Sequence, residues 1–117
     1  MPYKPGLHIL STFKSDDINL LATSSACRPF FELLIKRHDL RKVGDVYHDF
    51  DGGGFTAVLC LTESHLSIHT WPEFGLATFD VFLSNYQKEN DKKVRDIYQQ
   101  VLDFFKGETT QLQEINR

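Results

Sequence analysis

The sequence predicts an α+β fold, a two-layer sandwich in which a mainly antiparallel sheet carries two helices on one face. The apolar patterns run in the order strand, helical region, four consecutive strands and long helix. Strands that follow one another without an intervening helix usually pair antiparallel, and the helices then share one face of the sheet. The 117 residues hold no internal repeat or linker, so we expect a single domain over residues 1–117.

The expected strands are short apolar runs bounded by turn residues. Asp51 with the glycine run at residues 52–54, and the segment 72–75, mark two of the turns. The glycine run lacks the lysine and the following helix of a phosphate-binding loop, so we interpret it as a hairpin turn. The predicted strands are residues 7–13, 43–50, 55–61, 65–71 and 76–83, and residues 112–115 can add a last edge strand.

The two helical regions flank the four central strands. Ser15 or Asp16 is expected to cap the first region, which runs to about residue 38. Pro29 lies inside it and is expected to split or kink it, because proline cannot donate a backbone hydrogen bond. The second helix covers about residues 90–106, where apolar side chains recur at helical spacing, and the glycine that follows is a natural stop.

Composition and charge exclude several classes of protein. A formal net charge of −3 leaves no basic footprint, so we expect no nucleic-acid partner. No apolar run approaches the roughly 20 residues of a membrane span, and the N-terminus does not resemble a secretory signal. Cys27 and Cys60 lack the spacing of a disulfide framework and are interpreted as reduced thiols of a cytoplasmic protein.

The strand predicted at residues 65–71 separates its side chains into two kinds. Leu66 and Ile68 point one way, which we assign to the helix-covered core. The opposite side carries His65, Ser67, His69 and Trp71. This side lies on a sheet face without helices, and uncovered faces of small domains commonly pair with a second copy, so we expect a homodimer with a site near its interface.

A metal ion shared by His65 and His69 is not expected. Four residues along a strand separate two side chains by roughly 13 Å, whereas the same spacing on a helix would let them share one ion. The neighbours Ile68, Thr70 and Trp71 favour a strand. We therefore predict no metal site.

The residues alone leave the role of Ser64 open. No nucleophile-elbow motif surrounds it, and polar patterns on a strand are usually satisfied structural positions. The resemblance of the segment to a known family decides between these interpretations. Residues 63–73, with the sequence ESHLSIHTWPE, closely resemble the self-cleavage segment of the small prokaryotic S-adenosylmethionine decarboxylases. The likeness extends through residues 6–8, 49–50, 55–58 and 79–82.

The resemblance implies that the chain cuts itself between Glu63 and Ser64. Ser64 would then become a covalently bound pyruvoyl group, the cofactor of the reaction. His69 matches the proton donor and acceptor of this processing, and Thr56 matches an assisting hydroxyl that is usually serine in the family. Because Ser64 and His69 are five residues apart, a straight strand would point them to opposite sides, so we expect a strained bend at residues 63–65.

The resemblance also implies the substrate and its contacts. The pyruvoyl carbonyl would form a Schiff base with the amine of S-adenosylmethionine, and the decarboxylated product would serve spermidine synthesis. Phe50 and Trp71 match aromatic positions that contact the adenine and the sulfonium, and Glu73 matches an acid that binds ribose hydroxyls. Core packing is the alternative role for Phe50.

Ser84 departs from the family pattern. It stands in the string Phe82-Leu83-Ser84-Asn85, where the family normally has a cysteine that reprotonates the decarboxylated carbon. A hydroxyl is a much weaker acid than a thiol. Cys60, on a neighbouring strand, offers a substitute thiol, although we expect it to be buried and inert. Two alternatives follow: a pyruvoyl-dependent arginine or ornithine decarboxylase, and a non-catalytic paralogue.

Overall fold

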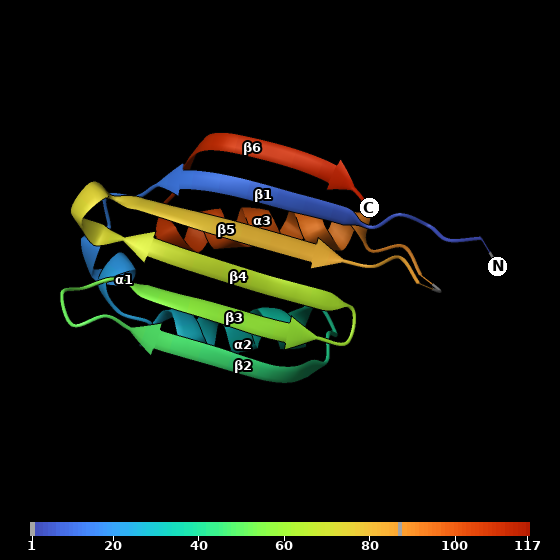
Figure 1. The fold of residues 1–117 in the computed structure, drawn as a ribbon, viewed down its shortest axis with the longest axis horizontal. Helices are drawn as coiled ribbons and strands as arrows, with labels where there is room; N and C mark the ends of the chain where they lie inside the picture. The colour runs from blue at the N-terminus through green and yellow to red at the C-terminus, as the bar shows by residue number, and fades with distance from the viewer. Residues whose placement is uncertain (1, 87) are drawn as a thin grey trace.

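The computed structural model describes residues 2–86 and 88–117 and contains one antiparallel sheet with helices on one face (Figure 1). In the described residues the sheet has six strands in the order β2-β3-β4-β5-β1-β6, and every neighbouring pair is antiparallel. The elements are β1 (Leu7–Lys14), α1 (Ile18–Ala22), α2 (Cys27–Arg37), β2 (Lys42–Asp49), β3 (Phe55–Leu61), β4 (Ser64–Trp71), a 3₁₀ turn (Pro72–Phe74), β5 (Leu76–Leu83), α3 (Asp91–Phe105) and β6 (Glu108–Asn116). The predicted α+β sandwich is confirmed.

The hydrophobic core lies between the sheet and the helices. Figure 1 shows α2 behind β2 and β3, and α3 behind β5 and β1. Leu66 and Ile68 of β4 are fully buried on this side, as the alternation predicted. The opposite side of β4 ends in the exposed side chains of His69 and Trp71, on the face that carries no helix. We call this face the open face.

The first helical region differs from the prediction. It forms two helices, α1 and α2, separated at residues 23–26, so the described chain has three helices rather than two. Pro29 neither splits nor kinks a helix, because it is the third residue of α2 and its missing N–H is not needed in the first turn. The break occurs earlier, where the backbone N–H of Ser24 donates to Asp49 Oδ1 at 2.9 Å.

The observed ends of two elements, α1 and the last strand, differ from the predicted ones. Asp17, rather than Ser15 or Asp16, caps α1 by accepting a hydrogen bond from the backbone of Leu20. The last strand is longer than expected and begins directly after Gly107. A Cβ atom on Gly107 would lie 2.7 Å from the ring of Phe13, so this glycine also permits close packing against β1. No helix in the described ranges is long and apolar enough to cross a membrane.

A buried threonine near the C-terminal end of β4 joins this strand to its neighbours. Thr70 is 5% exposed, and its hydroxyl donates to the carbonyl of Leu21 at 2.7 Å. The same oxygen accepts a hydrogen bond from the backbone N–H of Phe55 at 2.9 Å. One side chain therefore joins α1, β3 and β4.

We expect Thr70→Val to lower the free energy of unfolding by about 2 kcal/mol, because it leaves two buried backbone groups without a partner. Urea denaturation of the uncleaved Ser64→Ala chain measures this difference without interference from backbone cleavage. Thr110→Val, at an exposed position of β6, is the matched control and should change the value by less than about 0.5 kcal/mol. Equal effects of the two substitutions would show that the hydroxyl of Thr70 does not hold these elements together.

Candidate active site

The predicted cleavage bond lies in the turn between β3 and β4. Ser64 is the first residue of β4 and has a φ angle of 151°, a conformation that side-chain-bearing residues rarely adopt. The structure therefore places backbone strain within the segment 63–65, where the sequence predicted a bend. Strain of this kind is found mainly where the surrounding structure enforces it, and it clusters at functional sites.

The carbonyl of Glu63 is held by the strand end that carries Ser84. The backbone N–H of Ser84 donates to the carbonyl oxygen of Glu63 at 2.8 Å. This pairing follows from the sheet, because Ser64 lies opposite Leu83 in the register of β4 and β5. A fixed N–H donor polarises a carbonyl and stabilises the negative charge that develops on its oxygen during nucleophilic attack.

The side chain of Glu63 is also held, by residues that the sequence did not suggest. Lys88 Nζ lies 3.1 Å from Glu63 Oε1, and Asn90 Nδ2 donates to Glu63 Oε2 at 3.4 Å. Asn90 Nδ2 also donates to the carbonyl of Ser84 at 2.7 Å. Asn85 accepts a hydrogen bond from the backbone N–H of Asn90 at 2.7 Å. The buried asparagines thus hold the β3–β4 turn, which contains Glu63, against the segment after β5, which contains Ser84.

The position of Asn90 in the sequence predicts an N-cap rather than a contact with the cleavage turn. Asparagine directly before a helix is a common N-cap, and Asn90 directly precedes α3. Its side chain makes no capping hydrogen bond and is only 1% exposed. It turns instead toward Glu63 and Ser84. A cavity of about 350 Å³ lies beside the segment that follows β5 and is lined by Ser84, Asn85, Tyr3 and Tyr86, among others.

A second group of predicted site residues lies at the other end of the open face. A cavity of about 520 Å³ is lined there by Phe50, Thr56, His69, Trp71 and Glu73, among others. Thr56 Oγ1 and His69 Nδ1 share a hydrogen bond across β3 and β4. Phe50 is 51% exposed, so it is not a core residue. The site residues predicted from the sequence therefore line one cavity, although they come from three separate segments.

The two groups do not meet within one chain. Ser64 and His69 lie at opposite halves of β4, and five residues of strand span roughly 16 Å. Figure 1 shows the turn from β3 to β4 at one end of the sheet and the turn from β2 to β3 at the other. One end holds Glu63, Ser64 and Ser84, and the other holds the cavity with Thr56 and His69.

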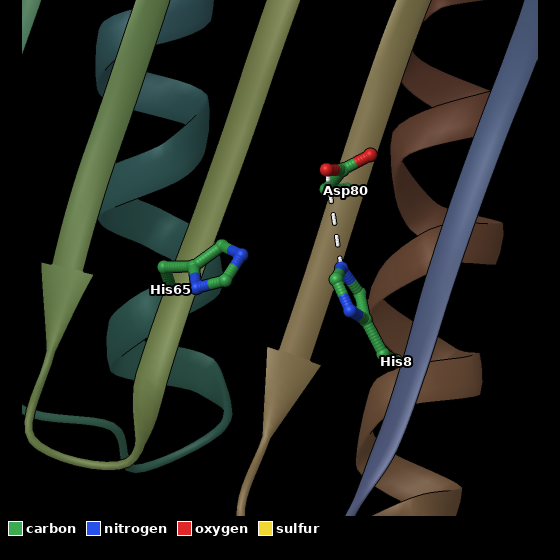
Figure 2. A group of neighbouring side chains, drawn as sticks. All are labelled: His8, His65 and Asp80. Carbon is green, nitrogen blue, oxygen red and sulfur yellow. Dashed lines mark ion pairs between the residues drawn. The ribbon is translucent and has the colours of Figure 1, made fainter. Parts of the chain in front are cut away.

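A third cluster lies on the open face close to Ser64. Figure 2 shows His8 of β1, Asp80 of β5 and His65 of β4 converging, with His8 Nε2 3.9 Å from Asp80 Oδ2. Burial lowers the pKa of His8, and Arg117 and His65 lower it further, whereas the nearby Asp80 carboxylate opposes the shift. No local sequence pattern connects these residues, because each lies on a different strand.

The two cysteines differ in environment. Cys27 is buried in α2, and burial raises the pKa of its thiol. Cys60 is exposed on β3, opposite His65 in the register of β3 and β4. The expectation that Cys60 is buried was therefore wrong. Outward-facing Val58 and Cys60 make β3 apolar on both sides, which removed the alternation that would have revealed the exposed side.

Comparison with known proteins gives a consistent result. Residues 7–117 match the family model described as S-adenosylmethionine decarboxylase. An S-adenosylmethionine decarboxylase proenzyme of Archaeoglobus fulgidus is 35% identical over 104 residues, which cover 89% of each chain. A proenzyme of Thermoplasma volcanium is 38% identical over 86 residues, which cover 74% of this chain and 66% of the relative.

The fold agrees with a solved structure of a protein of the same name. The crystal structure of the adenosylmethionine decarboxylase from Aquifex aeolicus superposes with a TM-score of 0.80 at 28% identity. The superposition covers 99% of this chain and 91% of the other. From the extent of the family match and the identity to the Archaeoglobus relative, this chain belongs to the S-adenosylmethionine decarboxylase family.

Proposed function

We propose that this chain is a pyruvoyl-dependent decarboxylase of S-adenosylmethionine that first cuts itself between Glu63 and Ser64. The observation that carries the proposal is the strained Ser64 next to a Glu63 carbonyl that accepts the Ser84 N–H at 2.8 Å. Family membership supports the substrate, because the relatives are named for decarboxylation of S-adenosylmethionine. The product would be the aminopropyl donor for spermidine synthesis, made in the cytoplasm.

Self-cleavage proceeds through an ester. Ser64 Oγ loses its proton and attacks the carbonyl carbon of Glu63, and the amide nitrogen leaves as the amine of residue 64. The Ser84 N–H stabilises the oxyanion formed on the way. A base then removes the α-proton of residue 64, and the Glu63 carboxylate leaves its Cβ. The resulting dehydroalanine tautomerises to an imine, takes up water and releases ammonia.

The residues around Ser64 fit the pyruvoyl group that these steps would leave at position 64. The new N-terminal group remains at the start of β4, between the ends of β3 and β5, and Ser84, which follows β5, lines the 350 Å³ cavity. Once formed, the pyruvoyl group would supply a carbonyl able to condense with the substrate amine and to withdraw electrons as carbon dioxide leaves. Phe50, Trp71 and Glu73 would bind the adenosyl part of the substrate.

A homodimer would bring the Ser64 end of one open face next to the Thr56–His69 end of another. Two open faces can pack against each other around a two-fold axis that lies between them and runs across the strands. That axis reverses strand direction, so the Ser64 end of one protomer faces the His69 end of its partner. Each dimer then contains two composite sites. Apolar side chains on the open face support this contact: Val46 is 66% exposed, Val58 43% and Trp71 39%.

Cleavage is the first test of the proposal. Purified protein is expected to give two fragments in intact mass spectrometry, one ending at Glu63 and one with a blocked, pyruvoyl-bearing residue at position 64. Ser64→Ala should remain full-length and keep a cooperative thermal transition, because the hydroxyl is needed for chemistry rather than for packing. Ser67→Ala, on the same strand, is the control and should cleave normally. A wild-type chain that stays intact after prolonged incubation would support the non-catalytic paralogue instead.

Mixed dimers test the composite site. Ser64→Ala and His69→Ala chains, differently tagged, should each remain uncut when expressed alone. In a mixed dimer one site combines the intact Ser64 of the His69→Ala chain with the intact His69 of its partner. In dimers purified through both tags, we therefore expect cleavage of the His69→Ala chain only, approaching the wild-type extent. Absence of this rescue in dimers confirmed by sedimentation would show that the two ends act within one chain.

Ser84 determines how well the mature enzyme turns over. Its backbone N–H acts in cleavage whatever its side chain, so Ser84→Cys should process normally. The thiol is a much stronger acid than the hydroxyl and should raise turnover of S-adenosylmethionine by roughly tenfold or more. Release of labelled carbon dioxide from S-adenosylmethionine, arginine and ornithine measures this, with Ser67→Cys as the control. Wild-type release from arginine or ornithine alone would contradict the proposed substrate.

A further inference from the structure

We propose that His8, His65 and Asp80 form a binding site for a transition-metal ion of the Zn²⁺ class on the open face of the sheet. The three residues are distinct from those to which we assign cleavage and substrate binding. The site therefore adds a ligand to the proposed function rather than a step to it.

The sheet places the three side chains on one rigid platform. His8 and His65 both lie opposite Phe82 in the strand registers, so they flank β5 from either side. Asp80 precedes Phe82 by two residues and points to the same face. Figure 2 shows the three side chains converging from β1, β4 and β5. Sites built on strands hold ligand geometry better than sites built on loops.

The distances are close to those of a metal site. One possible ligand atom from each residue lies within 4.8 Å of the other two. Zn²⁺ binds nitrogen and oxygen at about 2.0–2.2 Å, so ligand atoms in a tetrahedral site are roughly 3.3–3.5 Å apart. Closing the site requires a movement of about 1 Å. His65 and Asp80 are only half-buried, so rotation of their side chains can supply it.

An unsatisfied buried atom points into the cluster. His8 is 6% exposed, and its Nε2 atom makes no hydrogen bond. The 3.9 Å to Asp80 Oδ2 is too long for one. Buried ring nitrogens are normally paired, so one that faces a carboxylate and a second imidazole without a hydrogen bond is placed to act as a metal ligand.

The donor set selects the class of ion. Two imidazoles and one carboxylate suit Zn²⁺, Co²⁺, Ni²⁺ or Fe²⁺, whereas Mg²⁺ and Ca²⁺ prefer sites made only of oxygen. Three protein ligands leave at least one position for water.

Arg117 opposes metal binding at this site. Its Nη1 donates to His8 Nδ1 at 3.4 Å, which leaves the ring proton on Nε2, the atom that faces Asp80. Coordination through Nε2 moves that proton to Nδ1, where it meets the guanidinium, and the guanidinium also repels the cation. Arg117 is exposed and must swing away when an ion binds. Its removal is therefore expected to tighten binding.

Titration of the chelator-treated full chain with Co²⁺, followed by visible absorption and then by displacement with Zn²⁺, tests the proposal. We expect saturation at about one ion per chain and a loss of affinity of roughly tenfold or more in His8→Gln and in Asp80→Asn. His48→Gln, an exposed histidine on the same face, is the control and should bind like wild type. Arg117→Ala should bind more tightly.

Running the titration in the Ser64→Ala chain as well separates this proposal from self-cleavage. If His8→Gln does not fold, Asp80→Asn and Arg117→Ala still decide the result, because both side chains lie nearer the surface. Three results would each overturn the proposal: no saturable binding, equal loss in His48→Gln, or binding unchanged by Asp80→Asn. The first would indicate that the gap between His8 and Asp80 holds only water.

Discussion

The hydrogen bond from the Ser84 N–H to the Glu63 carbonyl is the contact on which the rest of the site depends. It exists because the ends of three strands meet: Ser64 lies opposite Leu61 of β3 and opposite Leu83 of β5. A slip of one residue in the β4–β5 register would remove the donor from the carbonyl. It would also turn every side chain of β4 to the other face, so that His69 entered the core and Ile68 faced outward. Burial of Leu66 and Ile68 therefore fixes the geometry of the cleavage bond.

The contacts that hold this turn leave helix α3 without a side-chain hydrogen bond at its N-cap. Asn90 occupies the N-cap position, yet its side chain contacts Glu63 and Ser84 rather than its own helix. A missing cap costs a helix typically about 1 kcal/mol. The side chain of Asn85 offsets part of this by accepting the backbone N–H of Asn90 and donating to Asp91 and to the carbonyl of Pro5. A local preference of the chain is here overridden by the polar contacts that hold the strained turn, as is common at functional sites.

Sequence patterns predicted the strands well and the polar contacts poorly, for a physical reason. The limits of β5 agree with the prediction, because residues 76–83 form an apolar run that follows the turn residues 72–75. The break between α1 and α2 depends on Ser24 and Asp49, which are 25 residues apart, and no local pattern encodes that bond. The roles of Asn85 and Asn90 and the meeting of His8 with Asp80 are equally non-local. The strained turn was predicted only because a straight strand could not place Ser64 and His69 on one side.

The distribution of the site over the open face bears on when the chemistry can occur. A single chain contains the strained bond, its carbonyl donor and the serine, but the Thr56–His69 pair lies at the far end of the same strand. In the proposed dimer that pair arrives from the other protomer, so a newly folded chain holds its cleavage bond without the group that would move its protons. The exposed valines and Trp71 that favour pairing are then the same surface that completes the site. Folding, association and self-cleavage would follow in that order, and a chain that misfolds or stays alone would keep its backbone intact.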